Sequence, residues 1–227
     1  MSATITKLTP SSLSALLCAR ICHDLISPVG ALSTAIEILD DESNSDMHDD
    51  ALNLVRNSSK QANAKLKFLR LAFGAGGSAP GIISVKEIQT LSQDMFAQGK
   101  ASLLWQISDV GIDKSQARLL LNMIMIGMQA VPRGGEVVIS QANRSDGATE
   151  LTIAATGPRA RLELAVERTL IGKAPEDGFD GRSIQPFYTG MMAREIGGNV
   201  SAVLDNETVT VTALLPQPAP ASANQSA

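Results

Sequence analysis

Two apolar stripes in the first third of the chain constrain the fold more than any other feature of the sequence. In the first, side chains fall within about 60° of Ile21 around one helix: Leu17, Leu25, Leu32, Ile36 and Leu39. The second repeats with 3,4 spacing through Leu52, Val55, Ser59, Ala62, Leu66, Leu69 and Phe73. An acidic, turn-rich segment at residues 40–46 separates them. The pattern predicts two long helices in an antiparallel hairpin over residues 1–74.

The hairpin also predicts an oligomeric state. Two helices cannot bury both of these stripes against each other, whereas two hairpins can do so as a four-helix bundle. Small residues in the middle of the second stripe, Ser59 and Ala62, allow a partner helix to approach closely. We therefore predict a homodimer.

The chain changes character after residue 74. Residues 75–81 have the composition of a flexible linker, and residues 216–227, rich in Pro, Ala, Ser and Gln, that of a disordered tail. Between them, residues 82–215 predict an α/β sandwich. Its expected strands are 101–108, 136–141, 150–155, 199–204 and 208–214, and its expected helices are 113–131, 159–171 and 184–196. The predicted fold class is therefore α+β, with the hairpin in front of the sandwich.

Composition excludes several classes of function. The net charge is −4 and only 3% of the residues are aromatic, which argues against binding to nucleic acid. Two histidines are too few for dense metal clusters. Cys18 and Cys22 lie one helical turn apart, and we expect them to pack in the core rather than to form disulfides. No signal peptide precedes the hairpin, and the most apolar stretch, Leu119–Val131, is too short to span a membrane, so we expect a cytoplasmic protein.

His23 is the residue best suited to chemistry. It lies about 200° around the helix from Ile21, so it is expected to point away from the apolar stripe. A histidine that accepts a phosphoryl group must present an unprotonated nitrogen, and a carboxylate such as Asp24 can hold the proton on the other nitrogen. Ser27, one turn further on, could bond to the ring or to a phosphoryl oxygen. The position alone would also fit an ordinary exposed histidine, but these neighbours favour phosphotransfer.

The same face of the helix continues with small residues, Gly30, Ala31 and Thr34. Such a surface lets a bulky partner protein dock beside the histidine, although a solvated face would tolerate the same residues. Lysines and arginines of the second helix could pair with an acidic partner or be simply solvated; they are Lys60, Lys65 and Arg70.

The motif from His23 to Pro28, His-Asp-Leu-Ile-Ser-Pro, resembles the H-box of sensor histidine kinases. Residues 82–215 resemble the kinase ATP-binding domain with its working residues replaced. Ile126 stands where the kinase asparagine would hold Mg²⁺, and Ala155 stands where the kinase aspartate would read adenine. An apolar side chain can do neither. The Gly134-Gly135 turn, by contrast, matches the kinase pattern.

A kinase-like hairpin with a domain that has lost its nucleotide residues resembles the ChpT family of histidine phosphotransferases of alphaproteobacteria, most clearly over residues 17–31 and 184–198. The resemblance covers nearly the whole chain apart from the tail. It implies a dimeric cytoplasmic phosphorelay protein of the cell cycle with His23 phosphorylated, and with no cofactor beyond Mg²⁺ supplied by the partner receiver domain. The implied donor is the receiver of a CckA-like hybrid kinase, and the implied acceptors are CtrA-like and CpdR-like response regulators. An active histidine kinase with an atypical ATP site and a non-enzymatic receiver-binding scaffold are the alternatives.

Overall fold

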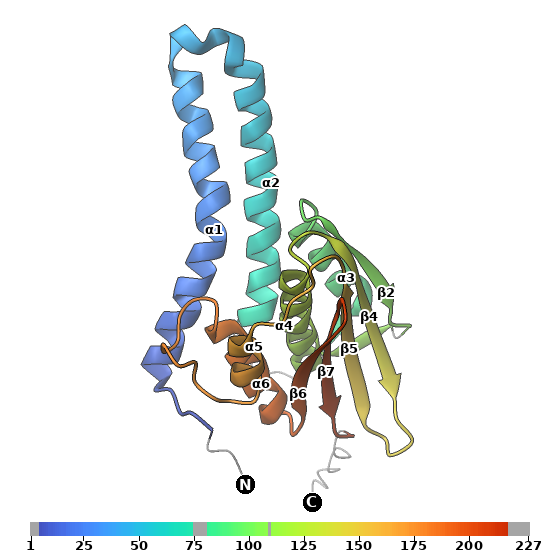
Figure 1. The fold of residues 1–227 in the computed structure, drawn as a ribbon. Helices are drawn as coiled ribbons and strands as arrows, with labels where there is room; N and C mark the ends of the chain where they lie inside the picture. Colours follow the sequence, from blue (N-terminus) through green and yellow to red (C-terminus); the bar gives the residue numbers. More distant parts are fainter. Residues whose placement is uncertain (1–4, 75–80, 109, 218–227) are drawn as a thin grey trace, which may run out of the picture.

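The computed structural model describes residues 5–74, 81–108 and 110–217. The predicted hairpin consists of α1 (Pro10–Asp40), a short 3₁₀ helix (Glu42–Met47) and α2 (His48–Phe73). The Thr9 side chain caps α1 by accepting a hydrogen bond from the Ser12 backbone N–H, and Pro10 occupies the first turn, where its missing N–H has no cost. Figure 1 shows the turn end of the two helices projecting beyond the rest of the chain, while their other ends lie against the α/β unit. The predicted hairpin is confirmed.

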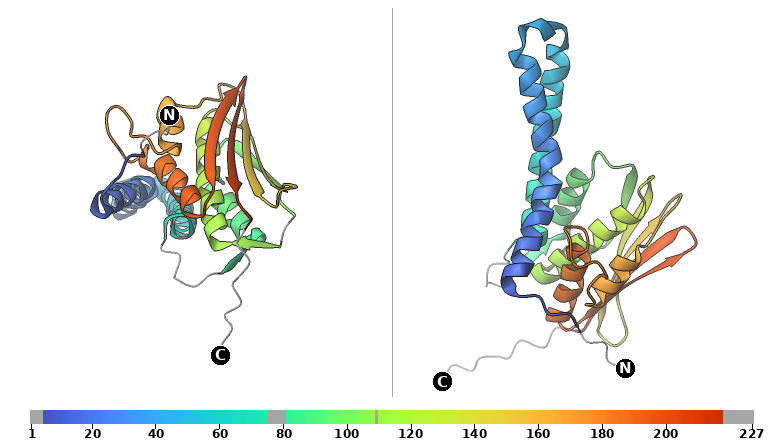
Figure 2. Two further views of the ribbon diagram at one scale, coloured as in Figure 1. Left: turned by 90° about the horizontal axis from the view of Figure 1, so that it is seen from below. Right: turned by 60° about the vertical axis from the view of Figure 1, so that its left-hand side comes forward.

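The second part of the chain is a mixed α/β unit. Its elements are β1 (Ile82–Ser84), α3 (Val85–Met95), β2 (Ala101–Gln106), β3 (Gly111–Asp113), α4 (Lys114–Ala130), β4 (Gly135–Asn143), β5 (Thr149–Thr156), α5 (Leu164–Leu170), α6 (Ile184–Glu195), β6 (Asn199–Asp205) and β7 (Thr208–Leu215). The main sheet has five strands in the order β2-β4-β5-β7-β6, and only the β2–β4 pair is parallel. The helices lie on the side of this sheet that faces the hairpin (Figure 2).

Most of the predicted elements of this unit are confirmed, with ends shifted by one or two residues. The helix expected over 159–171 is wrong in its first part, because it begins only at Leu164. Arg159 has a φ of 59°, and the Ala160 N–H donates to the Gly157 carbonyl, so the chain makes a turn there. Three elements were not predicted: α3 and the two short strands β1 and β3. A strand of three residues is too short to show alternation. Of the predicted linker only Gly81, and of the predicted tail only residues 216–217, lie within the described residues.

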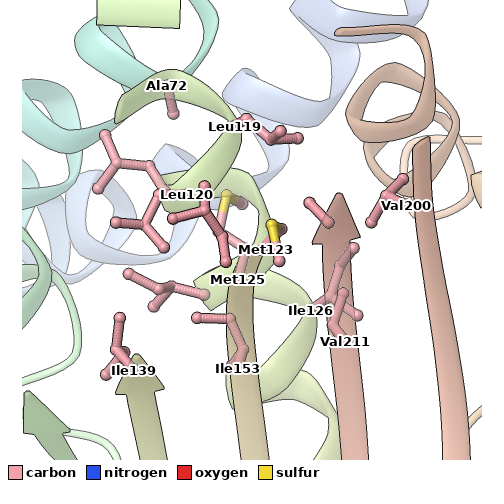
Figure 3. Packing of buried hydrophobic residues seen from close by; sticks show 14 of the residues in the cluster. Ala72, Leu119, Leu120, Met123, Met125, Ile126, Ile139, Ile153, Val200 and Val211 are labelled. Atoms are coloured by element: carbon pink, nitrogen blue, oxygen red, sulfur yellow. The ribbon is translucent and has the colours of Figure 1, made fainter. Parts of the chain in front are cut away.

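The core is built around α4, which is buried on nearly all sides. One side packs on the sheet, and the other meets the last turns of α2 at Phe68 and Ala72 (Figure 3). Met123 and Met125 are within this core. The amide of Asn122, fully buried, donates to the Ala72 carbonyl at 3.0 Å, and Gln185 of α6 donates to the Asn122 side-chain oxygen at 3.1 Å. The hairpin and the α/β unit are thus joined by buried polar contacts as well as by apolar packing.

The expected burial of the two cysteines is wrong for the single chain. Cys18 and Cys22 are both exposed, because the side of α1 that packs on the rest of the chain carries other residues, the buried Arg20, Pro28 and Ala35. Part of the first apolar stripe is uncovered for the same reason, and Ile36 is 51% exposed. The apolar face of α1 is therefore wider than one neighbouring helix can bury.

By length and composition, one helix among the described residues could cross a membrane. It is α1, in which an 18-residue window has a mean hydropathy of 1.4. Length and composition of this kind also fit a helix whose apolar face packs on other helices.

Candidate functional site

The His23 side chain points outward from α1, as the helical periodicity predicts. It is 66% exposed, and its Nδ1 lies 3.3 Å from Oδ1 of Asp24. When Nδ1 carries the proton, it donates that proton to the carboxylate, and Nε2 has a free lone pair directed to solvent. This is the tautomer in which an imidazole can attack an incoming electrophile.

Asp24 is held from a second direction by a residue that the motif does not include. The Arg20 Nε donates to the other carboxylate oxygen, Oδ2, at 3.0 Å. The side chains of this pair are only 8% and 13% exposed, respectively, so the contact is largely shielded from water. Asp24 therefore bridges Arg20 and His23 through its two oxygens.

Pro28 explains a third contact at the same place. A proline has no N–H, so Pro28 cannot complete the helical hydrogen bond to the Asp24 carbonyl four residues earlier. The Lys65 Nζ of α2 donates to that carbonyl instead, at 2.8 Å. A free backbone acceptor inside a packed structure is costly, and this contact removes the cost. Lys65 is thus turned toward α1 and braces the segment that carries His23.

The remaining predicted site residues form one strip along α1 beyond His23. Ser27, Gly30 and Thr34 are exposed, and Ala31 is half-buried. Ser27 makes no side-chain hydrogen bond to any described residue, so its hydroxyl is free for a visiting group. An added Cβ at Gly30 would meet nothing within 4 Å. The structure therefore brings the predicted residues together as a low, open surface next to the imidazole.

A cavity of about 560 Å³ lies between this part of α1 and the α/β unit. Arg20 and His23 form one wall. The opposite wall comes from the positions that resemble a kinase nucleotide site, together with the turn before α6, and includes Ile126, Gln129 and Arg182.

The residues present do not fit a bound nucleotide with its metal. Ile126 is 4% exposed and offers no ligand to Mg²⁺, and Ala155 is fully buried and offers no acceptor to an adenine amine. Asn122 retains its amide, but that amide is used to join α4 to α2. No cluster of three or more potential metal-ligating side chains occurs in residues 5–74, 81–108 and 110–217.

The glycine turn that matches the kinase pattern has a structural reason of its own. Gly135 has a φ of 138°, and a Cβ there would lie 2.1 Å from the Thr156 carbonyl oxygen. The turn between α4 and β4 thus packs directly against the end of β5, where only backbone can fit. Close backbone packing therefore explains the glycine at this position.

An outward histidine on a helical hairpin, followed by an α/β unit of this kind, defines a protein of the two-component phosphotransfer class. The family model of the histidine phosphotransferase C-terminal domain matches residues 85–208. The protein phosphotransferase ChpT of Brucella abortus (strain 2308) is 38% identical over 213 residues, 94% of this chain and all of the relative. The chain belongs to the ChpT family of histidine phosphotransferases and is therefore a transferase.

A solved structure agrees with this assignment. A bacterial phosphotransferase determined at 1.7 Å superposes with a TM-score of 0.82 at 33% identity, covering 93% of this chain and 100% of that chain. The Acinetobacter baumannii histidine kinase AdeS is a far more distant likeness, with 14% identity and a TM-score of 0.48 over 87% of this chain and 98% of that chain.

Sequence reasoning missed the surroundings of the site. The pairing of Arg20 with Asp24 had a sequence signal, since opposite charges four residues apart on a helix are neighbours. The contact of Lys65 with α1 had only the missing N–H of Pro28 as a clue. The cavity wall around Arg182 had none, because it depends on how the two parts of the chain pack.

Proposed function

We propose that the protein is a phosphorelay intermediate that takes a phosphoryl group from a receiver-domain aspartate onto His23 and passes it to the aspartate of a response regulator, without using ATP. The observation that carries the proposal is the exposed imidazole whose Nδ1 lies 3.3 Å from the Asp24 carboxylate. In this role Asp24 fixes the tautomer, and Ser27 supplies a hydroxyl to the phosphoryl oxygens.

The chemistry is a substitution at phosphorus. The Nε2 lone pair forms the N–P bond as the P–O bond to the donor aspartate breaks, and the carboxylate leaves; the proton on Nδ1 stays with the Nδ1···Asp24 contact. The second transfer runs the same substitution in reverse on the acceptor aspartate. Catalysis of such a step is largely positioning and charge stabilisation. The Mg²⁺ required by the phosphoryl oxygens belongs to the receiver's acidic site in this proposal.

Dimerisation is part of the proposal. Large apolar side chains remain exposed on the hairpin, among them Val29, Ile36, Leu52 and Leu66 at 40–52%. Leu52 and Leu66 belong to the stripe that predicts a four-helix bundle, and a second hairpin would bury them. We propose a cytoplasmic homodimer that presents one His23 on each outer side.

The partners are proposed from the family. We propose the receiver domain of a CckA-like hybrid kinase as the donor and CtrA-like and CpdR-like response regulators as acceptors, in cell-cycle control. Gly30, Ala31 and Thr34 form the surface on which the receiver docks. This surface carries no bulky side chain at Gly30 that would hold a partner away from His23.

The decisive experiment mixes the protein with a receiver domain carrying labelled phosphoaspartate, in the presence of Mg²⁺. We expect acid-labile, alkali-stable label on His23, and passage of that label to a second receiver. A parallel reaction with labelled ATP and Mg²⁺ alone is expected to give none. Label from ATP would instead indicate an active kinase, and receiver binding without label transfer would indicate a scaffold.

Replacing Asp24 with asparagine is expected to slow label transfer by about 10- to 100-fold. The neutral amide holds the Nδ1 proton less firmly and loses the ion pair with Arg20. The measurement is the single-turnover rate of transfer from the phosphorylated receiver. Size-exclusion chromatography with light scattering should give the wild-type mass, and an unchanged rate would remove the role assigned to Asp24.

Substitutions at Gly30 should separate docking from stability. Gly30→Leu is expected to weaken receiver binding by about 10-fold or more, because a bulky side chain at a close-packed interface forces the partner away. Gly30→Ala should be tolerated, since its methyl meets nothing within 4 Å in the free protein. Binding is measured by titration with an unphosphorylated receiver. Equal affinities for the two variants would place the docking surface elsewhere.

A further inference from the structure

The α/β unit meets helix α1 at α6 and at the turn just before α6. Arg20 reaches this turn with a second nitrogen, since its Nη1 donates to the Gly181 carbonyl at 3.4 Å. The backbones also lie close to each other, since a Cβ added at Gly181 would come within 3.8 Å of the Arg20 Cα. One guanidinium therefore contacts the carboxylate beside His23 and the backbone of the other part of the chain.

The turn that presents Gly181 is itself internally fixed. The Asp180 carboxylate accepts hydrogen bonds from the Ser183 hydroxyl at 2.6 Å, from the Ser183 N–H at 2.7 Å and from the Arg182 N–H at 3.0 Å. The bonds from Ser183 are the main cause of a pKa of Asp180 below its ordinary value. The carboxylate is thus charged at neutral pH, and the turn is held in one conformation.

The turn continues into a helix that cannot easily move. Ile184, the first residue of α6, is fully buried, and the helix is anchored by the bonds of Gln185 to Asn122. Asn122 in turn bonds to Ala72 at the end of α2. The turn thus has a fixed position relative to the hairpin.

We propose that Arg20 is a positioning residue for phosphotransfer: it holds Asp24, and through Asp24 the His23 imidazole, against the backbone of the turn at residues 180–183. The inference rests on the proposed function of His23. In this proposal the α/β unit helps to position His23, through Arg20 and Asp24, and does so without a bound nucleotide. Planar guanidinium geometry suits this task, since one side chain can donate in two directions at once.

The first test is a double-mutant cycle on the single-turnover rate of phosphoryl transfer from a labelled receiver. Arg20→Gln is expected to slow transfer by about 10-fold, the usual order for the loss of a group that orients a side chain in contact with the reacting residue. In the Asp24→Asn background the same change should cost less than about 2-fold, because Arg20 acts through Asp24. Independent effects that multiply, or an unchanged rate in Arg20→Gln, would overturn the proposal.

The second test perturbs the turn at residues 180–183 rather than Arg20. Asp180→Ala removes the acceptor that fixes the turn and should slow transfer in the wild type but not in the Arg20→Gln variant. Arg56→Gln is the matched control for the Arg20→Gln change, since Arg56 is exposed on α2 and its side chain bonds only to Asn53 among the described residues. An equal effect of Asp180→Ala in both backgrounds would contradict transmission through Arg20.

A spectroscopic measurement distinguishes positioning from simple loss of stability. Ring ¹⁵N shifts of His23 report the tautomer, and we expect the Nδ1–H form to lose population in Arg20→Gln while the fold, judged by backbone amide shifts, is retained. Arg20→Lys keeps the charge and should restore part of the rate and of the tautomer population; if Arg20→Gln does not fold, Arg20→Lys carries the same comparison. An unchanged tautomer in a slowed variant would contradict the proposal. Failure of the wild type to accept label would instead overturn the proposed function.

Discussion

A His23→Gln variant is expected to accept no phosphoryl group from a phosphorylated receiver, with label reduced by at least about 100-fold relative to the wild type. Glutamine has a similar reach and can hydrogen-bond, but its amide nitrogen has no basic lone pair with which to form an N–P bond. The His23 side chain is 66% exposed, and within the described part of the chain its ring hydrogen-bonds to Asp24 alone, so the change should leave the fold intact. The measurement is label on the protein after a few seconds with labelled receiver and Mg²⁺.

The variant must still bind its partner for this result to be informative. Titration with an unphosphorylated receiver should give an affinity within a few-fold of the wild type, because the docking strip at Gly30, Ala31 and Thr34 is untouched. His48, the other histidine, provides a matched control, and His48→Gln should accept label normally. Label that persists in His23→Gln would move the phosphoacceptor to another residue.

The outward direction of His23 was predictable because it depends only on helical periodicity. The same arithmetic placed Ser27, Gly30 and Thr34 on one surface, and the structure agrees. Periodicity gave the wrong environment for Cys18 and Cys22, since it identifies a broad apolar face but not which part of that face the nearest helix covers. Their exposure follows from how the rest of the chain packs on α1, which a pattern within one helix cannot reveal.

The contacts that hold Asp24 in place were harder to predict from the sequence. The Arg20–Asp24 pair follows from four-residue spacing, but the third participant, Gly181, is 161 residues away from Arg20 in the chain. A carbonyl group has no residue-specific signal, so this contact exists only in the packed structure. Asn122 shows the converse: its position matches a kinase motif, yet its amide bonds to the Ala72 carbonyl and to Gln185 and serves the junction between the two parts of the chain. Residue identity alone does not reveal such a change of use.

Packing of α6 is expected to be the most sensitive point of the fold. A Cβ at Gly190 would lie 1.9 Å from the Leu170 carbonyl oxygen, the same oxygen that accepts a hydrogen bond from Arg194 at 3.0 Å. Gly190→Ala must therefore push α6 away from the end of α5. We expect it to lower the free energy of unfolding by about 3 kcal/mol, the upper part of the usual range for overpacking, despite the better helix propensity of alanine. Urea denaturation followed by circular dichroism measures this change.

Gly30→Ala is the matched control, because it makes the same change inside another helix where nothing lies within 4 Å of the new methyl. It should raise the free energy of unfolding by about 0.5–1 kcal/mol. A displaced α6 would also move the turn at residues 180–183, so folded Gly190→Ala should transfer label more slowly than its folded fraction accounts for, and this extra loss should disappear in an Arg20→Gln background. Equal stability of Gly190→Ala and Gly30→Ala would mean that α6 can shift at little cost, and the α/β unit would then be too loosely held to support Arg20.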